Sequence, residues 1–266
     1  MGGDKMFATD FIFNSQRASD LDLIICTFNG ENEPASGGEI EYEVVKTPDR
    51  DNFTYYGAKM ESVLVWNISI CKNPCKTETM FFTQTEERTI QKWLTKLDGY
   101  KLLQFLQDGY EDVYYRVLID CIPHQISGRT IGFDLKITSD CAYGYSDEII
   151  QECQINSSNP YVFMVNNDIN RYIYPHIIIN GSGTFFISNE SDPRQNLSTK
   201  KYSNFKNVEN EIIMNSDCDI IMGINSPDDF SWYFIRLLDG INTIVTDSES
   251  DISMKIKYRE IRRVIV

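Results

Sequence analysis

Two histidines are the side chains of this 266-residue sequence best suited to acid–base chemistry near neutral pH. His124 lies in Cys121-Ile-Pro-His-Gln-Ile-Ser-Gly128, between two expected strands, and His176 opens an isoleucine run after Pro175. A histidine in a catalytic triad needs a nucleophile and a carboxylate in fixed geometry, and no motif here supplies them. The sequence therefore favours a turn residue for His124 and a solvent-facing strand end for His176.

Three carboxylates at two-residue intervals, in Asp247-Ser-Glu-Ser-Asp251, have the oxygen ligands that Ca²⁺ prefers. The segment lacks the glycine and the bidentate glutamate of a calcium loop, so a solvated turn is the favoured interpretation. The sequence contains no nucleotide-binding, zinc-protease or serine-hydrolase motif. We expect no catalytic residue, no metal site and no cofactor.

The aromatic cluster Phe230-Ser-Trp-Tyr-Phe234 has two interpretations. In a strand, Phe230, Trp232 and Phe234 would share one face, which is the pattern of a sandwich core. The alternative is a platform on which sugar rings stack, because aromatic faces are apolar and flat. We favour the interpretation that this cluster belongs to a sandwich core.

Composition narrows the class of protein. Lys plus Arg number 25 and Asp plus Glu 39, which gives a net charge of −14 and disfavours a nucleic-acid clamp. The 15 Tyr and 15 Phe favour strands. The length fits one large domain or two ordinary ones. Together these features favour a β-rich structural or binding protein over an enzyme.

The seven cysteines are expected to be reduced and buried or half-buried. The close pair Cys71 and Cys75 has a spacing typical of neither a redox motif nor a zinc knuckle. The sequence shows no apolar run long enough to span a membrane and no export signal, so we expect folding in the cytoplasm. The Asn-X-Ser/Thr sequons are then a matter of composition.

Glu39, Glu41 and Glu43 alternate with apolar residues and would share one face of a strand. An ordinary solvated face is one interpretation, and a face paired with lysines of a neighbouring molecule is another.

One helix is expected among the strands of the first half. Thr83 and Glu86 have capping-box spacing, the apolar residues of 90–97 recur on one helix face, and Gly99 provides a stop. We expect the helix over Glu86–Leu97, covering a sheet. Strands are expected at residues 10–14, 21–28, 39–45, 62–71, 101–106, 113–121 and 130–138.

The second half predicts strands without a helix. Residues 147–159 have the composition of a linker, and the expected domains are 1–150 and 151–266. Gly181-Ser-Gly183 is predicted to be a turn. Strands are expected at residues 161–165, 176–179, 184–188, 211–215, 219–224, 231–237, 243–246 and 251–258.

The order of several short motifs resembles that of the distal tail protein family of long-tailed bacteriophages. Phe11-Ile-Phe-Asn14 with Ser19-Asp-Leu-Asp-Leu-Ile24 resembles the start of the family, although Leu21-Asp22 replaces the usual Phe-Gly. Pro48, Asp49, Arg50 and Asp51 resemble its Pro-Gly-Arg-Asp hairpin, without the glycines. Further similar motifs are Tyr55-Tyr-Gly-Ala58, Ile90-Gln-Lys-Trp-Leu94, Tyr114-Tyr-Arg-Val-Leu-Ile119, Gly128–Ile137, Ser139–Tyr145, Tyr174–Ile179 and Leu238–Ile244.

The resemblance implies a mainly β fold: an N-terminal split β-barrel or sandwich with one helix and an extended hairpin, then a C-terminal galectin-like β-sandwich. It implies a non-enzymatic tail-tip protein made in the cytoplasm of the host bacterium. Six copies would form a homohexameric ring that joins the tail tube protein to the tail-associated hub protein and carries receptor-binding or baseplate proteins. The hairpin around Pro48, Asp49, Arg50 and Asp51 would contact the neighbouring subunit.

Such a ring gives Glu39, Glu41 and Glu43 a hypothetical role as an acidic lining past which DNA slides without specific binding. Two other functions stay open from sequence. One is a carbohydrate-binding module of a tail or cell-surface protein, and the other is an enzyme domain of a tail lysin.

Overall fold

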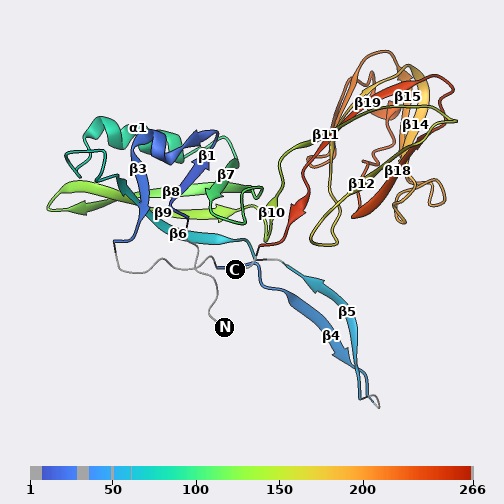
Figure 1. The fold of residues 1–266 in the computed structure, drawn as a ribbon. Coiled ribbons are helices and arrows are strands. Elements are labelled where there is room, and N and C mark those ends of the chain that lie inside the picture. The colour runs from blue at the N-terminus through green and yellow to red at the C-terminus, as the bar shows by residue number, and fades with distance from the viewer. Residues whose placement is uncertain (1–7, 29–35, 49–50, 61, 265–266) are drawn as a thin grey trace. The chain divides into compact units, whose positions relative to one another are not determined.

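The structure is a computed structural model that describes residues 8–28, 36–48, 51–60 and 62–264. It is mainly β and divides into two compact units, which are treated separately below (Figure 1). The first unit runs to Tyr145 and takes in the chain end from Arg263, and the second unit is Ser146–Arg262. The expectation of a mainly β chain is confirmed.

The first unit is organised around one antiparallel sheet with the strand order β2-β1-β7-β8-β9-β6-β3. Among the described residues this sheet stays open and does not close into a barrel. Its alternating strands place Trp66, Ile68 and Ile70 in the core, as the sequence pattern indicates. The strands are β1 (Asp10–Phe13), β2 (Gln16–Arg17), β3 (Leu23–Cys26), β6 (Val65–Lys72), β7 (Lys101–Leu106), β8 (Tyr115–Ile126) and β9 (Arg129–Ser139).

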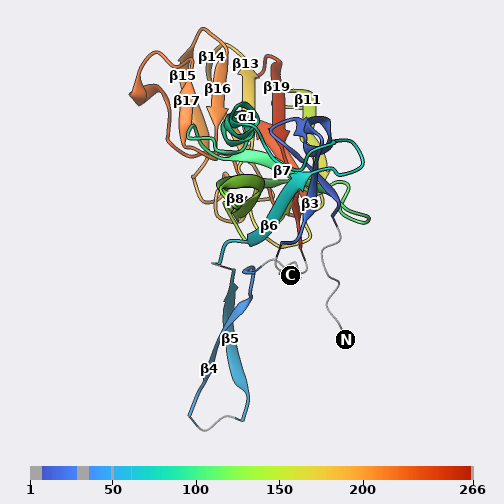
Figure 2. The same ribbon diagram turned by 90° about the vertical axis from the view of Figure 1, so that its left-hand side faces the viewer.

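Helix α1 (Gln84–Leu94) lies along one face of this sheet (Figure 1 and Figure 2). The capping box predicted for Thr83 and Glu86 is present. Trp93 anchors the helix, since its ring stacks on Phe11 at 5.7 Å and its indole N–H donates to the carbonyl of Phe13 at 3.1 Å. The predicted extension to Leu97 is wrong: the chain turns extended at Thr95, and Leu97 is 96% exposed.

Short elements complete the first unit. A 3-10 helix, η1 (Ala18–Leu21), replaces the start of the strand expected at 21–28. The extended hairpin consists of β4 (Glu41–Lys46) and β5 (Phe53–Lys59), which form a separate two-stranded sheet. The strand expected at 39–45 therefore begins two residues later. Strand β10 (Gly144–Tyr145) ends the unit.

The second unit buries apolar side chains between a five-stranded sheet, β11-β19-β13-β16-β17, and a four-stranded sheet, β12-β18-β14-β15. Two sheets that bury their apolar faces form the core of a β-sandwich. The strands are β11 (Ile149–Ile155), β12 (Tyr161–Val165), β13 (His176–Asn180), β14 (Gly183–Asn189), β15 (Ser203–Val208), β16 (Ile212–Asn215), β17 (Ile220–Met222), β18 (Gly240–Thr246), β19 (Ile252–Tyr258) and the short β20 (Ile261–Arg262).

Three local predictions for this unit are wrong. The expected linker at 147–159 contains β11, which pairs with β19 over its whole length. Strand β15 has no counterpart among the expected strands. The strand expected at 231–237 is irregular, because Trp232 has a left-handed backbone with φ of 60°. The turn predicted at Gly181-Ser-Gly183 is confirmed between β13 and β14.

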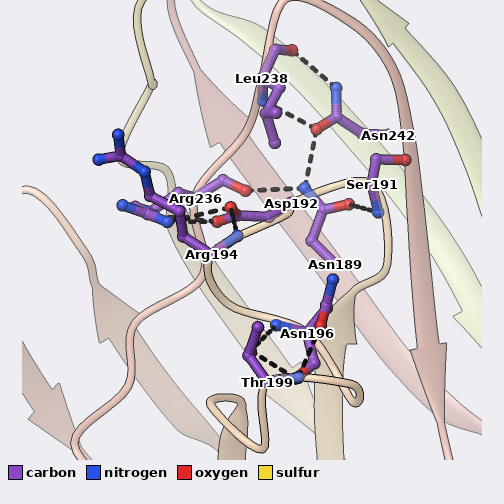
Figure 3. A network of polar contacts seen from close by, with 9 residues as sticks. All are labelled: Asn189, Ser191, Asp192, Arg194, Asn196, Thr199, Arg236, Leu238 and Asn242. Atoms are coloured by element: carbon purple, nitrogen blue, oxygen red, sulfur yellow. Dashed lines mark hydrogen bonds and ion pairs between the residues drawn. The ribbon is translucent and has the colours of Figure 1, made fainter.

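A buried ion pair holds the long connection between β14 and β15 (Figure 3). The Asp192 carboxylate is fully buried, and both of its oxygens accept from the Arg236 guanidinium at 2.7–3.0 Å. The Arg194 backbone N–H adds a bond at 2.9 Å. The Arg236 guanidinium also lies 4.1 Å from the centre of the Tyr172 ring. This network fixes the connection without regular structure.

Candidate functional site

The β4–β5 hairpin is the candidate functional site, because it exposes large apolar side chains along both of its strands. The strands pair antiparallel from Glu41 opposite Lys59 to Lys46 opposite Phe53. A β-bulge interrupts the register between Glu43 and Val44 and leaves Tyr56 as the extra residue on β5.

The register separates the side chains of the hairpin into two faces. Directly opposed residues share a face, and successive residues alternate. One face, called the apolar face below, carries Tyr42, Val44, Phe53 and Tyr55, with Ala58 opposite Tyr42 and Lys46 opposite Phe53. All four are exposed, so this face of the hairpin is not covered by the described part of the chain.

The opposite face, called the acidic face, carries Glu41 and Glu43 beside Lys59. The Lys59 ammonium forms an ion pair with Glu43. Glu39 precedes β4 and is exposed. The predicted alternation of glutamates with apolar residues therefore holds within the strand, and Lys59 offsets part of the acidic charge.

Two of the four residues that the family resemblance singled out are described by the structure. Pro48 and Asp51 are exposed and flank the tip. Asp49 and Arg50 lie outside the described residues. The hairpin implied by the family resemblance requires a second strand here, but the residue pattern alone did not lead us to expect β5, although the alternation in Phe53-Thr-Tyr55 is a signal that could have identified it.

The remaining candidates for chemistry are dispersed. His124 lies within β8 instead of a turn, where its Nδ1 is 3.0 Å from Asp134 Oδ2 and its ring stacks on Phe28 at 4.2 Å. His176 opens β13 as predicted, but it is half-buried and its Nδ1 is shielded from solvent, so the expectation that it faces solvent is wrong.

Two carboxylates of the segment 247–251 accept hydrogen bonds from a backbone N–H and from a side-chain amide. Asp247 accepts from the N–H of Phe186 at 2.9 Å, and Asp251 accepts from the Asn156 side chain at 2.8 Å. Within the described ranges, no cluster of three or more His, Cys, Asp or Glu side chains could hold a metal ion.

The cysteines are free thiols, but Cys75 and Cys218 are exposed, contrary to the expectation of burial. Burial, with the neighbouring Cys71 thiol, raises the pKa of Cys26. Burial also raises the pKa of Cys141 to about 12, with opposing smaller contributions from its hydrogen bonds. These two thiols are therefore protonated near neutral pH. No helix in the described segments is long and apolar enough to cross a membrane.

The aromatic cluster is divided by the fold. Phe230 and Phe234 are buried and pack against each other at 5.3 Å, as the core interpretation predicts. Trp232 points outward and is 54% exposed. The prediction of one shared face is wrong for Trp232, because its left-handed backbone breaks the strand alternation.

Comparison with known proteins identifies relatives of both units. A family described as the phage tail protein N-terminal domain matches residues 6–141, and one described as the phage tail C-terminal domain matches residues 143–258. None of the curated proteins compared with the chain is a match.

Two solved structures share the fold. One is the Dit protein (gp 19.1) of phage SPP1, with a TM-score of 0.57 and 10% identity over 94% of this chain and 98% of that chain. That protein is described as a paradigm of the hub adsorption apparatus in phages that infect Gram-positive bacteria. The other is a chain of the phage p2 baseplate in its activated conformation with Sr, with a TM-score of 0.50 and 11% identity over 93% and 97%. The chain thus belongs to the phage tail protein family, and its fold is that of a distal tail protein.

Proposed function

We propose that six copies of this chain form a ring at the tip of a phage tail, between the tail tube protein and the tail-associated hub protein. The ring carries receptor-binding or baseplate proteins, acts by assembly and not by catalysis, and is built from subunits made in the host cytoplasm. Family membership and the fold shared with a hub protein support this role. The apolar face of the β4–β5 hairpin is the observation that carries it.

The physical argument concerns what covers this hairpin. A two-stranded hairpin alone in water is marginally stable, and soluble monomers rarely expose contiguous apolar patches of this kind. Tyr42, Val44, Phe53 and Tyr55 together form such a patch on one face. A second copy of the chain in the ring would cover it. Such a contact joins different surfaces of the two copies, and repeated by rotation it closes a ring.

The tip residues belong to the same contact in this proposal. Pro48, Asp49, Arg50 and Asp51 would lie at the far end of the hairpin, where it reaches the neighbouring subunit. Arg50 supplies a cation that can form a paired, charge-assisted contact with a carboxylate of the neighbour.

The acidic face has a separate role in the proposal. Glu39, Glu41 and Glu43 would border the channel, where like-charge repulsion lets DNA pass without specific binding. Since Lys59 pairs with Glu43, the repulsion would come mainly from Glu39 and Glu41. A high-resolution map of the assembled ring with these glutamates on its outer wall would refute this role.

Negative-stain electron microscopy of the purified chain at increasing concentration tests the assembly. The proposal expects rings with six-fold symmetry and a mass of about 185 kDa, six times 30.8 kDa. Rings with a number of subunits other than six would refute the proposed copy number. A chain that stays a monomer, both alone and mixed with tail tube protein, would refute assembly.

A further inference from the structure

Trp232 is exposed, and its backbone conformation is unusual for a bulky residue. Its φ of 60° lies in the left-handed region that bulky L residues rarely adopt. Ordinary strand geometry would have placed Trp232 on the same side as the buried Phe230 and Phe234. The chain therefore departs from strand geometry at the residue whose side chain it turns towards water, and such departures concentrate at functional sites.

The residue before Trp232, Ser231, is hydrogen-bonded to the start of β15 and to the residue that precedes it. The Ser231 N–H donates to the Asn204 carbonyl at 3.1 Å, and the Ser231 hydroxyl donates to the Tyr202 carbonyl at 2.7 Å. The same hydroxyl accepts from the Asn204 N–H at 2.9 Å. These bonds fix the position from which the indole projects.

The indole itself is held by two contacts. Its N–H donates to the carbonyl of Pro227 at 3.2 Å, at the start of the 3-10 helix η2 (Pro227–Asp229). Its ring meets the Phe230 ring edge-on, with centres 5.7 Å apart and planes inclined by 66°. The ring is thus preorganised, while more than half of the residue is accessible to a ligand.

Exposed polar side chains belong to the segment that holds this ring and to the strand beside it. The Lys206 ammonium contacts the Asp228 carbonyl at 3.5 Å, next to the residue that holds the indole. The Asp228 carboxylate is exposed, and so is Asn225, whose amide contacts the Asn207 carbonyl at 3.1 Å. A flat aromatic ring, with an ammonium, a carboxylate and an amide on neighbouring segments of the chain, offers one stacking surface together with donors and acceptors for hydroxyl groups.

We infer that the second unit binds a neutral pyranose oligosaccharide, one ring of which stacks on Trp232. The apolar face of a pyranose covers the indole, and its hydroxyls bond to Lys206, Asp228 and Asn225. The exposed carboxylate of Asp228 disfavours an anionic sugar. A protein partner is the less favoured occupant, because the centre of a protein interface is depleted of charged residues. This activity is additional to the assembly role and does not depend on ring formation.

The chain provides its own optical probe for this site. Of its three tryptophans, Trp66 and Trp93 are 3% and 7% exposed, so acrylamide quenches chiefly the fluorescence of Trp232. The probes are maltohexaose, cellohexaose, chitohexaose and mannohexaose, each titrated into the full chain. We expect at least one of them to shift the emission to shorter wavelength and to protect it from acrylamide, with saturation.

Two substitutions of Trp232 distinguish the loss of its aromatic ring from the loss of the fold. Asn tolerates a left-handed backbone, so Trp232→Asn removes the platform and keeps the local conformation. Trp232→Tyr keeps an aromatic face. By isothermal titration calorimetry with the sugar that binds, we expect Trp232→Asn to weaken binding about tenfold or more, and Trp232→Tyr by no more than about threefold. Matching thermal unfolding curves confirm that both variants fold.

Three results would overturn the inference. The first is an unchanged emission with all four oligosaccharides at millimolar concentration. The second is sugar binding that Trp232→Asn leaves intact. The third is protection of the indole by rising protein concentration without sugar, which would assign Trp232 to a protein contact.

Discussion

Lys72 and Glu86 join the sheet to the start of α1 through single side-chain contacts. The Lys72 ammonium is nearly buried and donates to Glu86 Oε1 at 2.7 Å and to the Phe81 carbonyl at 3.0 Å. Glu86 Oε2 accepts from the Thr83 N–H at 2.7 Å in the capping box. One carboxylate therefore serves both the helix terminus and a buried cation.

Glu86→Gln should destabilise the first unit in a pH-dependent way. Burial raises the pKa of Glu86, but the bonds from Lys72 and Thr83 outweigh burial and lower that pKa overall. A lowered pKa in the folded state contributes stability above the unfolded value of about 4.3, and this contribution is lost as the pH falls through the folded value. We expect a loss of about 1 kcal/mol at pH 7, reduced by the partial exposure of Glu86.

Urea unfolding at pH 7 and at pH 3 measures this effect. The difference between the wild type and Glu86→Gln should shrink towards zero at the lower pH. Glu87→Gln is the matched control, since Glu87 shares the first helical turn but is not the acceptor for Lys72. A pH-independent difference, or an equal loss in the control, would contradict the assigned contact.

Loss of the ion pair between Asp192 and Arg236 should lower the free energy of unfolding more than Glu86→Gln does. Arg236→Met would leave the fully buried Asp192 carboxylate without the guanidinium, which costs about 3–5 kcal/mol for a buried pair. Arg194→Met should cost less than about 1 kcal/mol, because Arg194 bonds to Asp192 through its backbone N–H. Urea unfolding of the second unit checks both. Similar losses for the two variants would contradict this ranking.

At the scale of elements, the hairpin β4–β5 offers a matched pair of valines. Val44 and Val45 are neighbours in β4 with exposures of 48% and 53%, but Val44 lies on the apolar face and Val45 on the acidic face. Replacement by Ser removes the same apolar area and alters strand propensity equally. A difference in self-association between the two variants therefore shows which face of the hairpin another copy covers.

We expect Val44→Ser to weaken self-association about tenfold or more for each contact and Val45→Ser to weaken it less than about threefold. Sedimentation equilibrium gives the association constants. Equal effects of the two variants, or a larger effect of Val45→Ser, would show that the apolar face is not the one used.

Alternation and capping patterns made several elements predictable. The Thr83–Glu86 capping box located the start of α1, and the alternation from Leu64 to Ile70 placed Trp66, Ile68 and Ile70 in the core. Such patterns reflect local geometry, which depends on a few neighbouring residues.

Other features depend on contacts that a local pattern does not contain. Leu97 continues the helical spacing after Leu94, yet the backbone becomes extended at Thr95. The alternation of 39–45 identified a two-faced strand, but it could not show that its apolar side has no cover within the described chain. The left-handed Trp232 adjoins Ser231, whose hydrogen bonds reach Tyr202 and Asn204, far away in sequence.

At the scale of the whole molecule, the net charge of −14 is distributed unevenly. Residues 1–150 carry 24 acidic and 14 basic side chains, which gives −10, and residues 151–266 carry 15 and 11, which gives −4. In the proposed ring, most of the acidity belongs to the part of the chain that contains the hairpin. Six copies would then surround the channel with a field that repels DNA.

Electron cryomicroscopy of the assembled protein tests the central claim most directly, since it shows both the copy number and the surroundings of the hairpin. The account predicts a six-fold ring in which Tyr42, Val44, Phe53 and Tyr55 of each subunit are buried against the next subunit. A ring in which these four side chains face solvent, or an assembly without six-fold symmetry, would contradict it.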